Sequence, residues 1–414
     1  MNALVGYSRY RFGIEHSRLR ESPGGAPVGG SRFEQGSGLD EGTARVDLSV
    51  QAGARHRLAA GGTAVTRGFR PVDIERVRGA GADEDVYEAT ATSGTVGAAV
   101  YVSDEIALSR ALRATVGLRA DALRSAGRQW GALQPRARID GSIGGGWYLA
   151  ASGDRTWQPV HQLTNAGIGL PTDLWIPATE TLSPGTGLQA SAEAGRRWAG
   201  WEASASVFAR RMSGVVEYLD ASASLPSGTD WEADVTSGEG RAAGVELFVR
   251  KSGGRTEGWA GYTLSRSTRA FAEIEAGRAF PYRYDRTHSA TLVLTHALSA
   301  RRRVGLTAVA STGQAATFPI SYSFPDPYRF SDRAAGRFPT YHRVDASYEV
   351  EYGPGTLTLS VYNVYNRRNP FALTLDTVSR AAPGPGGGPP TQQTVLRAIT
   401  LFPLLPSVSY ARRF

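Results

Sequence analysis

The sequence AITLFPLLPSVSYARRF, residues 398–414, indicates the fold most directly, because it is a long run without a turn signal. Side chains of a β-strand point alternately to its two faces. Counted back in steps of two, one face carries Phe414, Arg412, Tyr410 and Val408, and the other carries Arg413, Ala411, Ser409 and Ser407. Apart from Arg412, the first face is apolar and the second is polar or small. This pattern is typical of a strand with one face in lipid and the other in a polar lumen.

The same alternation recurs along the chain. In residues 343–350, Val344, Ala346, Tyr348 and Val350 oppose Arg343, Asp345, Ser347 and Glu349, and in residues 357–361, Leu357, Leu359 and Val361 oppose Thr358 and Ser360. Helical periodicity is absent over comparable lengths, so we predict an all-β, antiparallel fold with about sixteen strands. The predicted spans are 3–16, 43–57, 60–70, 92–104, 109–121, 133–143, 147–160, 187–197, 201–218, 241–251, 256–269, 286–298, 302–314, 341–352, 356–369 and 398–413.

The connections between these spans fall into two classes that alternate. Short ones contain glycine, as tight hairpins require; examples are Gly61-Gly62, Gly144–Gly146 and Ala199-Gly200. The long ones are 17–42, 71–91, 122–132, 161–186, 219–240, 270–285, 315–340 and 370–397. Transmembrane β-barrels of the outer-membrane type sort their connections in this way, with short periplasmic turns and long outer loops. The alternation therefore predicts an antiparallel transmembrane β-barrel.

Composition is consistent with a protein of the cell envelope. The 414 residues include no cysteine, so there is no disulfide framework and no thiolate metal site. The uncharged runs are too short or too interrupted by proline for a membrane helix, so a membrane crossing would use strands. No signal-peptide pattern follows Met1. We therefore expect Met1 to be an internal start and the chain to be a fragment.

The net charge of +8 comes almost entirely from arginine, since Lys251 is the only lysine among the 46 basic residues. We interpret this ratio as a codon bias of the genome. No basic helix or base-stacking module is present, so we expect no nucleic-acid partner.

Two segments near the C-terminus carry a family resemblance. The sequence YHRVDAS at 341–347, followed by LTLSVYNVYNRRNP at 357–370, resembles the penultimate strands of TonB-dependent outer-membrane receptors. The sequence LFPLLPSVSY at 401–410 looks like the subgroup that often carries a carboxypeptidase-regulatory-like N-terminal domain. The resemblance is specific from about residue 240 onward and weaker before it.

This resemblance implies a plugged barrel of about 22 strands. The chain would supply a single domain, residues 1–414, that lacks the plug and the first strands. It would lie in the outer membrane of a Gram-negative bacterium and import a scarce nutrient, such as an iron chelate, cobalamin or an oligosaccharide. The implied partners are that small-molecule nutrient, outer-membrane lipid and lipopolysaccharide, the barrel-assembly machinery, and the TonB complex only through the missing N-terminal region. No cofactor is implied.

Two other functions remain as alternatives. A passive porin-like channel of about sixteen strands would need neither plug nor TonB. A soluble secreted β-protein with carbohydrate-binding loops would show the same alternation with one wet face. An enzyme is disfavoured, because no HExxH, GxSxG or P-loop motif occurs. The six histidines are scattered, so we predict no metal site.

Candidate ligand-binding residues lie in the predicted outer loops. Aromatic rings beside a guanidinium suit sugars, aromatic chelates or anions. The candidates are Trp175, Trp231, Tyr322, Phe324, Tyr328 and Arg329. The alternative for these side chains is packing between loops. A second aromatic set near strand ends, Trp147, Trp201, Trp259 and Tyr362, is predicted to form an interfacial belt.

Overall fold

The computed structural model describes residues 1–21, 27–79, 85–164, 173–219, 230–321, 329–380 and 391–412. All the long strands but β23 and β24 belong to one sheet, which has 17 strands. They are β1 (Asn2–Glu21), β2 (Pro27–Ala52), β3 (His56–Gly79), β4 (Asp85–Ala107), β5 (Leu112–Ser125), β6 (Arg128–Gly144), β7 (Trp147–Gln158), β10 (Gly185–Trp198), β11 (Trp201–Tyr218), β12 (Val235–Lys251), β13 (Thr256–Ala270), the two-residue β14 (Phe280–Pro281), β15 (His288–Ser299), β16 (Arg302–Ser311), β21 (Tyr341–Tyr352), β22 (Gly355–Tyr362) and β25 (Leu405–Arg412). Apart from β14, each of these strands corresponds to one predicted span. The predicted antiparallel architecture and strand count are therefore confirmed.

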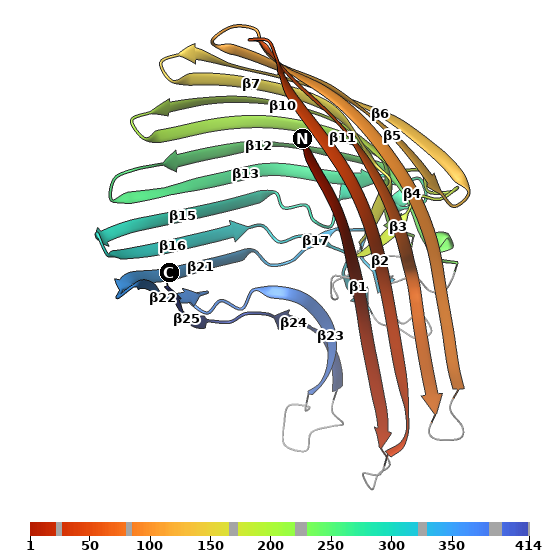
Figure 1. Ribbon diagram of the computed structural model, residues 1–414. Coiled ribbons are helices and arrows are strands. Elements are labelled where there is room, and N and C mark those ends of the chain that lie inside the picture. The colour runs from red at the N-terminus through yellow and green to blue at the C-terminus, as the bar shows by residue number, and fades with distance from the viewer. Residues whose placement is uncertain are drawn as a thin grey trace.

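Each long strand of this sheet pairs antiparallel with the next one along the chain, from β1–β2 to β22–β25. Figure 1 shows the result as a strongly curved wall around an open interior. Among the described residues, no pairing joins β1 to β25, so the sheet has two free edges. No helix in the described part of the chain is long and apolar enough to span a membrane.

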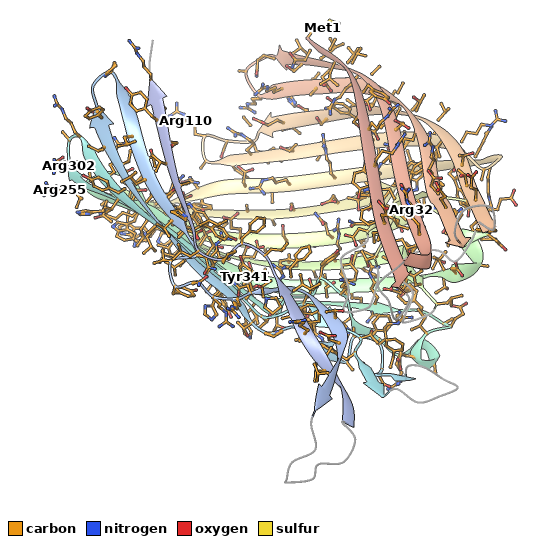
Figure 2. The ribbon with its side chains drawn as sticks, turned by 90° about the horizontal axis from the view of Figure 1, so that it is seen from below. Met1, Arg32, Arg110, Arg255, Arg302 and Tyr341 are labelled. Atoms are coloured by element: carbon orange, nitrogen blue, oxygen red, sulfur yellow. The ribbon has the colours of Figure 1, made fainter. Side chains whose placement is uncertain are left out.

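Small elements fill the connections at one end of the strands. They are the two-stranded sheets β8 (Val160–Leu163) with β9 (Leu174–Pro177), β17 (Ala315–Ala316) with β20 (Gly336–Arg337), β18 (Pro319–Ser321) with β19 (Arg329–Phe330) and β23 (Pro370–Arg380) with β24 (Thr391–Thr400), and the short 3-10 helices η2 (Trp231–Asp234) and η3 (Glu275–Gly277). Every connection at the opposite end is a tight turn. In Figure 2, Arg110, Arg255 and Arg302 lie at this tight-turn end and Tyr341 lies at the loop end.

Several predicted boundaries are wrong. Most of 17–42 and 71–91 is strand, because β1 to β4 extend far beyond the others at the loop end. The connection predicted at 122–132 is a tight turn at Ala126 and Gly127, which both have positive φ. Residues 398–414 are not one strand, since β24 ends at Thr400 and β25 begins at Leu405.

The turn predicted at Gly61-Gly62 is also wrong, because the chain turns at residues 53–55. Gly61 lies inside β3, where a Cβ atom would come within 2.5 Å of the Tyr101 ring and 2.7 Å of the Val46 carbonyl oxygen. Its missing side chain makes room for the tyrosine across the strand. A glycine pair alone does not distinguish this packing role from a turn.

The predicted faces of the C-terminal strands are confirmed by their register. Leu359 lies opposite Tyr348 on β21 and opposite Val408 on β25, so these apolar side chains share one face. On the other face, the hydroxyls of Ser360 and Ser407 are hydrogen-bonded at 2.6 Å. The apolar face is solvent-exposed in the isolated chain, as a lipid-facing wall would be.

The predicted aromatic belt is correct for only two of its four members. Trp147 and Trp201 lie on the apolar face near the tight-turn end, where Trp201 pairs with Trp198. Trp259 instead faces inward, with its ring 6.2 Å from that of Phe248. Tyr362 also faces inward, with the Arg343 guanidinium 4.1 Å from its ring centre. Position near a strand end does not determine the face, because one residue of shift reverses it.

The two faces of β22 give the first testable prediction. A Leu359→Arg substitution places a charge on the apolar face and is expected to destabilise folding into lipid by about 2–4 kcal/mol. A Ser360→Arg substitution, one residue away on the polar face, should cost much less. Urea titration of both variants in liposomes measures the difference. Equal destabilisation by the two arginines would contradict the assigned faces.

Candidate ligand site at the loop end

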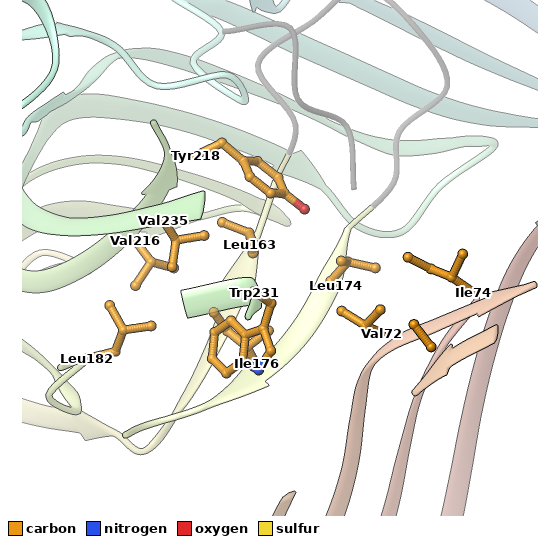
Figure 3. Close-up of a cluster of buried hydrophobic side chains, with 11 residues drawn as sticks. Val72, Ile74, Leu163, Leu174, Ile176, Leu182, Val216, Tyr218, Trp231 and Val235 are labelled. Atoms are coloured by element: carbon orange, nitrogen blue, oxygen red, sulfur yellow. The ribbon is translucent and has the colours of Figure 1, made fainter. Parts of the chain in front are cut away.

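The β8–β9 hairpin crosses the concave side of the wall at the loop end. Leu163, Leu174 and Ile176 of this hairpin are completely buried. Figure 3 shows them between Val72 and Ile74 of β3 on one side and a second group, Val216, Tyr218, Trp231 and Val235, on the other. Burying one such aliphatic side chain contributes about 1.5–3 kcal/mol. The hairpin is therefore a packed bridge between two distant sectors of the wall.

A cavity of about 170 Å³ lies beside this bridge. Its polar lining includes His161 and Gln162 from β8, Arg210 from β11, Arg269 from β13, and Tyr282. The Arg269 guanidinium lies 3.7 Å from the centre of the Tyr282 ring and donates a 2.8 Å hydrogen bond to the Val216 carbonyl. No carboxylate lines this cavity among the described residues. Two guanidiniums and a tyrosine face make the cavity suitable for an anionic group.

The charge balance near the cavity includes one carboxylate outside its lining. Glu217, on β11, is only 3% exposed and lies 3.9 Å from the buried guanidinium of Arg333. Arg333 also donates 2.8 Å hydrogen bonds to the carbonyls of Tyr218 and Leu219. Glu217 thus interacts with the cavity residue Arg269 as well as with Arg333, and Arg210 is the guanidinium left exposed to the cavity.

His161 stays uncharged at neutral pH. It is 4% exposed, and burial lowers the pKa of its imidazole to about 4. Its Nε2 atom has no hydrogen-bond partner among the described residues. A neutral imidazole with a free ring nitrogen can donate or accept one hydrogen bond without adding charge.

Hydrogen bonds tie the segment that carries Tyr282 to the hairpin. Tyr284 donates to Asp173 at 2.6 Å, and Gln162 donates to the same carboxylate at 3.1 Å. Burial and the hydrogen bond to Asp173 raise the pKa of the Tyr284 hydroxyl. A further ion pair joins Arg337 to Asp285, which accepts a 2.6 Å hydrogen bond from the Ser267 amide. The cavity is therefore held by loops that are fixed to one another.

The inner face below the cavity carries charge pairs. Arg119 pairs with Asp121 at 2.9 Å and Arg138 with Asp140 at 3.3 Å. Arg250 pairs with Glu202 on the neighbouring strand at 2.7 Å. Such exposed pairs contribute about 0–1 kcal/mol each. The polar inner face is therefore a charge-balanced wall, which suits contact with water or with a protein plug.

The predicted loop residues have different positions. Trp175 lies on the face of β9 opposite Leu174 and Ile176, and is half-buried. Trp231 is 6% exposed and belongs to the hydrophobic bridge. Arg329 begins β19, opposite Ser321. The other candidates, Tyr322, Phe324 and Tyr328, lie outside the described residues. The structure therefore brings Trp175 and Trp231 to the same hairpin region, on different sides of β9.

Sequence reasoning missed the side chains of the cavity. His161, Arg210, Arg269 and Tyr282 come from four separate stretches, and none belongs to a motif. The only signal was the segment PYRYDRTH at 281–288, which was notable for its family resemblance rather than for a binding role. Among the described residues, no three His, Asp or Glu side chains gather where they could hold a metal ion.

Solved structures of outer-membrane receptors share this fold. The ferripyoverdine receptor of Pseudomonas aeruginosa is 11% identical with a TM-score of 0.58, and covers 88% of this chain and 50% of its own. The ferric citrate transporter FecA is 12% identical with a TM-score of 0.57, and covers 99% of this chain and 59% of its own. The ferric-catecholate import receptor Fiu of E. coli K12 is 13% identical with a TM-score of 0.58, and covers 98% of this chain and 61% of its own.

No protein-family model matches the sequence, and no curated protein matches it significantly. The chain spans 50% to 61% of the length of the three receptors. At 11% to 13% identity the likeness is one of fold alone. The chain shares the antiparallel β-sheet wall of these three structures over most of its length.

Proposed function

We propose that the chain is the barrel wall of a TonB-dependent receptor in the outer membrane of a Gram-negative bacterium, and that it takes part in nutrient import. The two-faced sheet carries this proposal, because its apolar face suits lipid and its charged face suits a lumen. Tight turns at one end and packed loops at the other support it, as does the fold of the three receptors. The subgroup suggested by residues 401–410 belongs to the same proposal.

The free edges of the sheet support a larger barrel. Unpaired backbone groups cannot be left in lipid, since each costs several kcal/mol there. We propose that further strands join β1 to β25, that a plug fills the interior, and that the TonB complex acts through an N-terminal region. The barrel-assembly machinery would insert the whole wall.

The substrate that the cavity suits best is a small anionic nutrient, such as an iron chelate. Arg210 and Arg269 would hold its negative charge, and Tyr282 would contact its flat or apolar part. Trp175, Tyr322, Phe324, Tyr328 and Arg329 are proposed as outer contacts, with Trp231 shaping the hairpin beneath them. Cobalamin or an oligosaccharide would use the aromatic residues more than the arginines.

A passive channel is the second candidate, because porins close with about 16–18 strands and this sheet has a similar number. In that case β1 would pair with β25. Conductance of the purified chain in a planar bilayer, together with an efficient cross-link between cysteines introduced near Tyr7 and Tyr410, would favour the channel over the receptor.

Ligand capture can be tested at Arg210, which is exposed to the cavity. The Arg210→Gln variant should weaken binding of ferric citrate by about tenfold or more, since a charge-assisted hydrogen bond contributes about 1.5–3 kcal/mol. Tryptophan fluorescence quenching of the detergent-folded chain would report the affinity. The control is Arg250→Gln, at the tight-turn end of the same inner face. Equal losses in both variants, or no loss in either, would contradict this site.

The orientation of the wall gives another prediction. A cysteine in place of Glu273, which is exposed at the loop end, should react with a membrane-impermeant maleimide on intact cells. A cysteine in place of Gly254, in the turn between β12 and β13, should react only after the outer membrane is permeabilised. The chain has no native cysteine, so the background is low. The opposite labelling pattern would invert the orientation.

A further inference from the structure

The outward face of β11, β12 and β13 shows a sharp border. Along each strand, four consecutive outward positions are uncharged, and the next one toward the loop end is arginine. The uncharged sets are Ala203, Ala205, Val207 and Ala209 on β11, Val249, Leu247, Val245 and Ala243 on β12, and Gly258, Ala260, Tyr262 and Leu264 on β13. The arginines that follow are Arg211, Arg241 and Arg266, and all three are exposed. The border is therefore a shared feature of three adjacent strands.

The register confirms that these arginines are neighbours. Arg211 lies directly opposite Arg241, and Arg266 lies opposite Ala243, two residues from Arg241. On the other side, Leu188 of β10 lies opposite both Arg211 and Arg155 of β7. Cross-strand partners share a face and lie about 4.5–5.5 Å apart. Four guanidiniums thus gather on one sector of the outward face.

The height of the border matches a membrane boundary. Arg211, Arg241 and Arg266 each lie ten residues from the tight-turn end of their strand, at Trp201, Lys251 and Thr256. With a rise of about 3.4 Å per residue and a tilt of about 40°, ten residues span about 25 Å, the height of the apolar band of an outer-membrane barrel. Since Trp201 marks one border of that band, the arginines mark the other.

A hollow of about 1010 Å³ lies beside these arginines on the outward face. On each of five strands the lining is a run of three consecutive residues, and the first and third residues of each run point outward. The small residues among these outward ones are Ala137, Gly153, Ala190, Ala209 and Ala243. Arg155, Arg211, Arg241 and Arg266 line the same hollow. Small side chains leave space at the sheet surface, and the guanidiniums border that space. The combination suits a molecule with both acyl chains and an anionic headgroup.

The charges of this sector are only partly neutralised by the described protein. Arg211 pairs with Glu239 at 3.1 Å, with both side chains exposed. Arg241 and Arg266 make no ion pair with a described residue. On the neighbouring strand β15, His288 lies opposite Leu264, one outward position nearer the tight-turn end than Arg266, and the exposed Arg286 lies two residues before His288. A local excess of positive charge at a lipid border calls for an anion at that border.

We propose that the outward face of β7 and β10–β13 binds one phosphate-bearing, multi-chain lipid of the outer leaflet. Its phosphate lies on Arg211, Arg241 and Arg266, because planar guanidiniums bind phosphate oxygens in pairs. Its acyl chains cover the small residues of the hollow. The site is separate from nutrient capture, which uses the inward face, but it rests on the proposed outer-membrane location.

The test is native mass spectrometry of the full chain folded in detergent, with added bis-phosphorylated, six-chain lipid A as the probe. The Arg241→Gln/Arg266→Gln variant should bind lipid A about tenfold more weakly than the unaltered chain. The matched control is Arg196→Gln/Arg302→Gln, which removes two exposed outward arginines at the tight-turn end and should bind normally. The Arg241→Lys/Arg266→Lys variant keeps the charge and should recover most of the binding.

Two further probes show which part of the lipid provides the affinity. Phosphatidylcholine, which has acyl chains but no net charge, should bind more weakly than lipid A, and millimolar inorganic phosphate should not displace lipid A. Equal binding by the Gln variant and its control would overturn the proposal, as would equal affinity for phosphatidylcholine. Displacement by inorganic phosphate would reduce the site to an anion site without a lipid. Heat-modifiable gel migration of every variant shows that the wall has folded, so a lost lipid site is distinguishable from a lost barrel.

Discussion

Backbone hydrogen bonding in an apolar environment is the constraint on which this structure depends. In lipid, every amide and carbonyl must find a partner within the protein, and a long antiparallel ladder provides one for each. Once the ladder is fixed, side chains can only point in or out, so polarity is sorted residue by residue. That sorting places Leu359 with Tyr348 and Val408 on one face and Ser360 with Ser407 on the other. The charge pairs of the inner face and the arginine border of the outer face follow from the same geometry.

The loop end is built on a different principle. There the connections leave the ladder and bury side chains against each other, so the β8–β9 hairpin becomes a hydrophobic bridge inside the curved wall. Arg333, Asp285 and Tyr284 then tie neighbouring loops to this bridge through hydrogen bonds to carbonyls and carboxylates. The cavity beside it is a consequence of that packing. Function at this end therefore depends on contacts between segments that are far apart in the sequence.

This difference explains what could be predicted from the sequence. The strands, their order and the faces of β21, β22 and β25 follow from alternation in single short segments such as residues 343–350. The ends of the strands were harder to predict than the strands themselves. Gly61 was predicted to form a turn, although it makes room for Tyr101 inside β3. The outer parts of β1 to β4 were predicted to be loops because they are rich in polar residues. Trp259 and Tyr362 were predicted to lie on the wrong face of the sheet, because nearness to a strand end does not determine which face a side chain occupies. His161, Arg210 and Arg269 meet only after folding, so no local pattern could reveal them.

The central claim is that alternate residues of each long strand face lipid. The most direct measurement is a spin-label scan of residues 242–249 on β12 in liposomes, which compares collision with oxygen against collision with a polar nickel chelate. The account predicts a period of two, with the ratio of oxygen to nickel collisions highest at Ala243, Val245, Leu247 and Val249, and lowest at Ala242, Gly244, Glu246 and Phe248. A profile without a period of two, or one with its maxima on the second set, would contradict it.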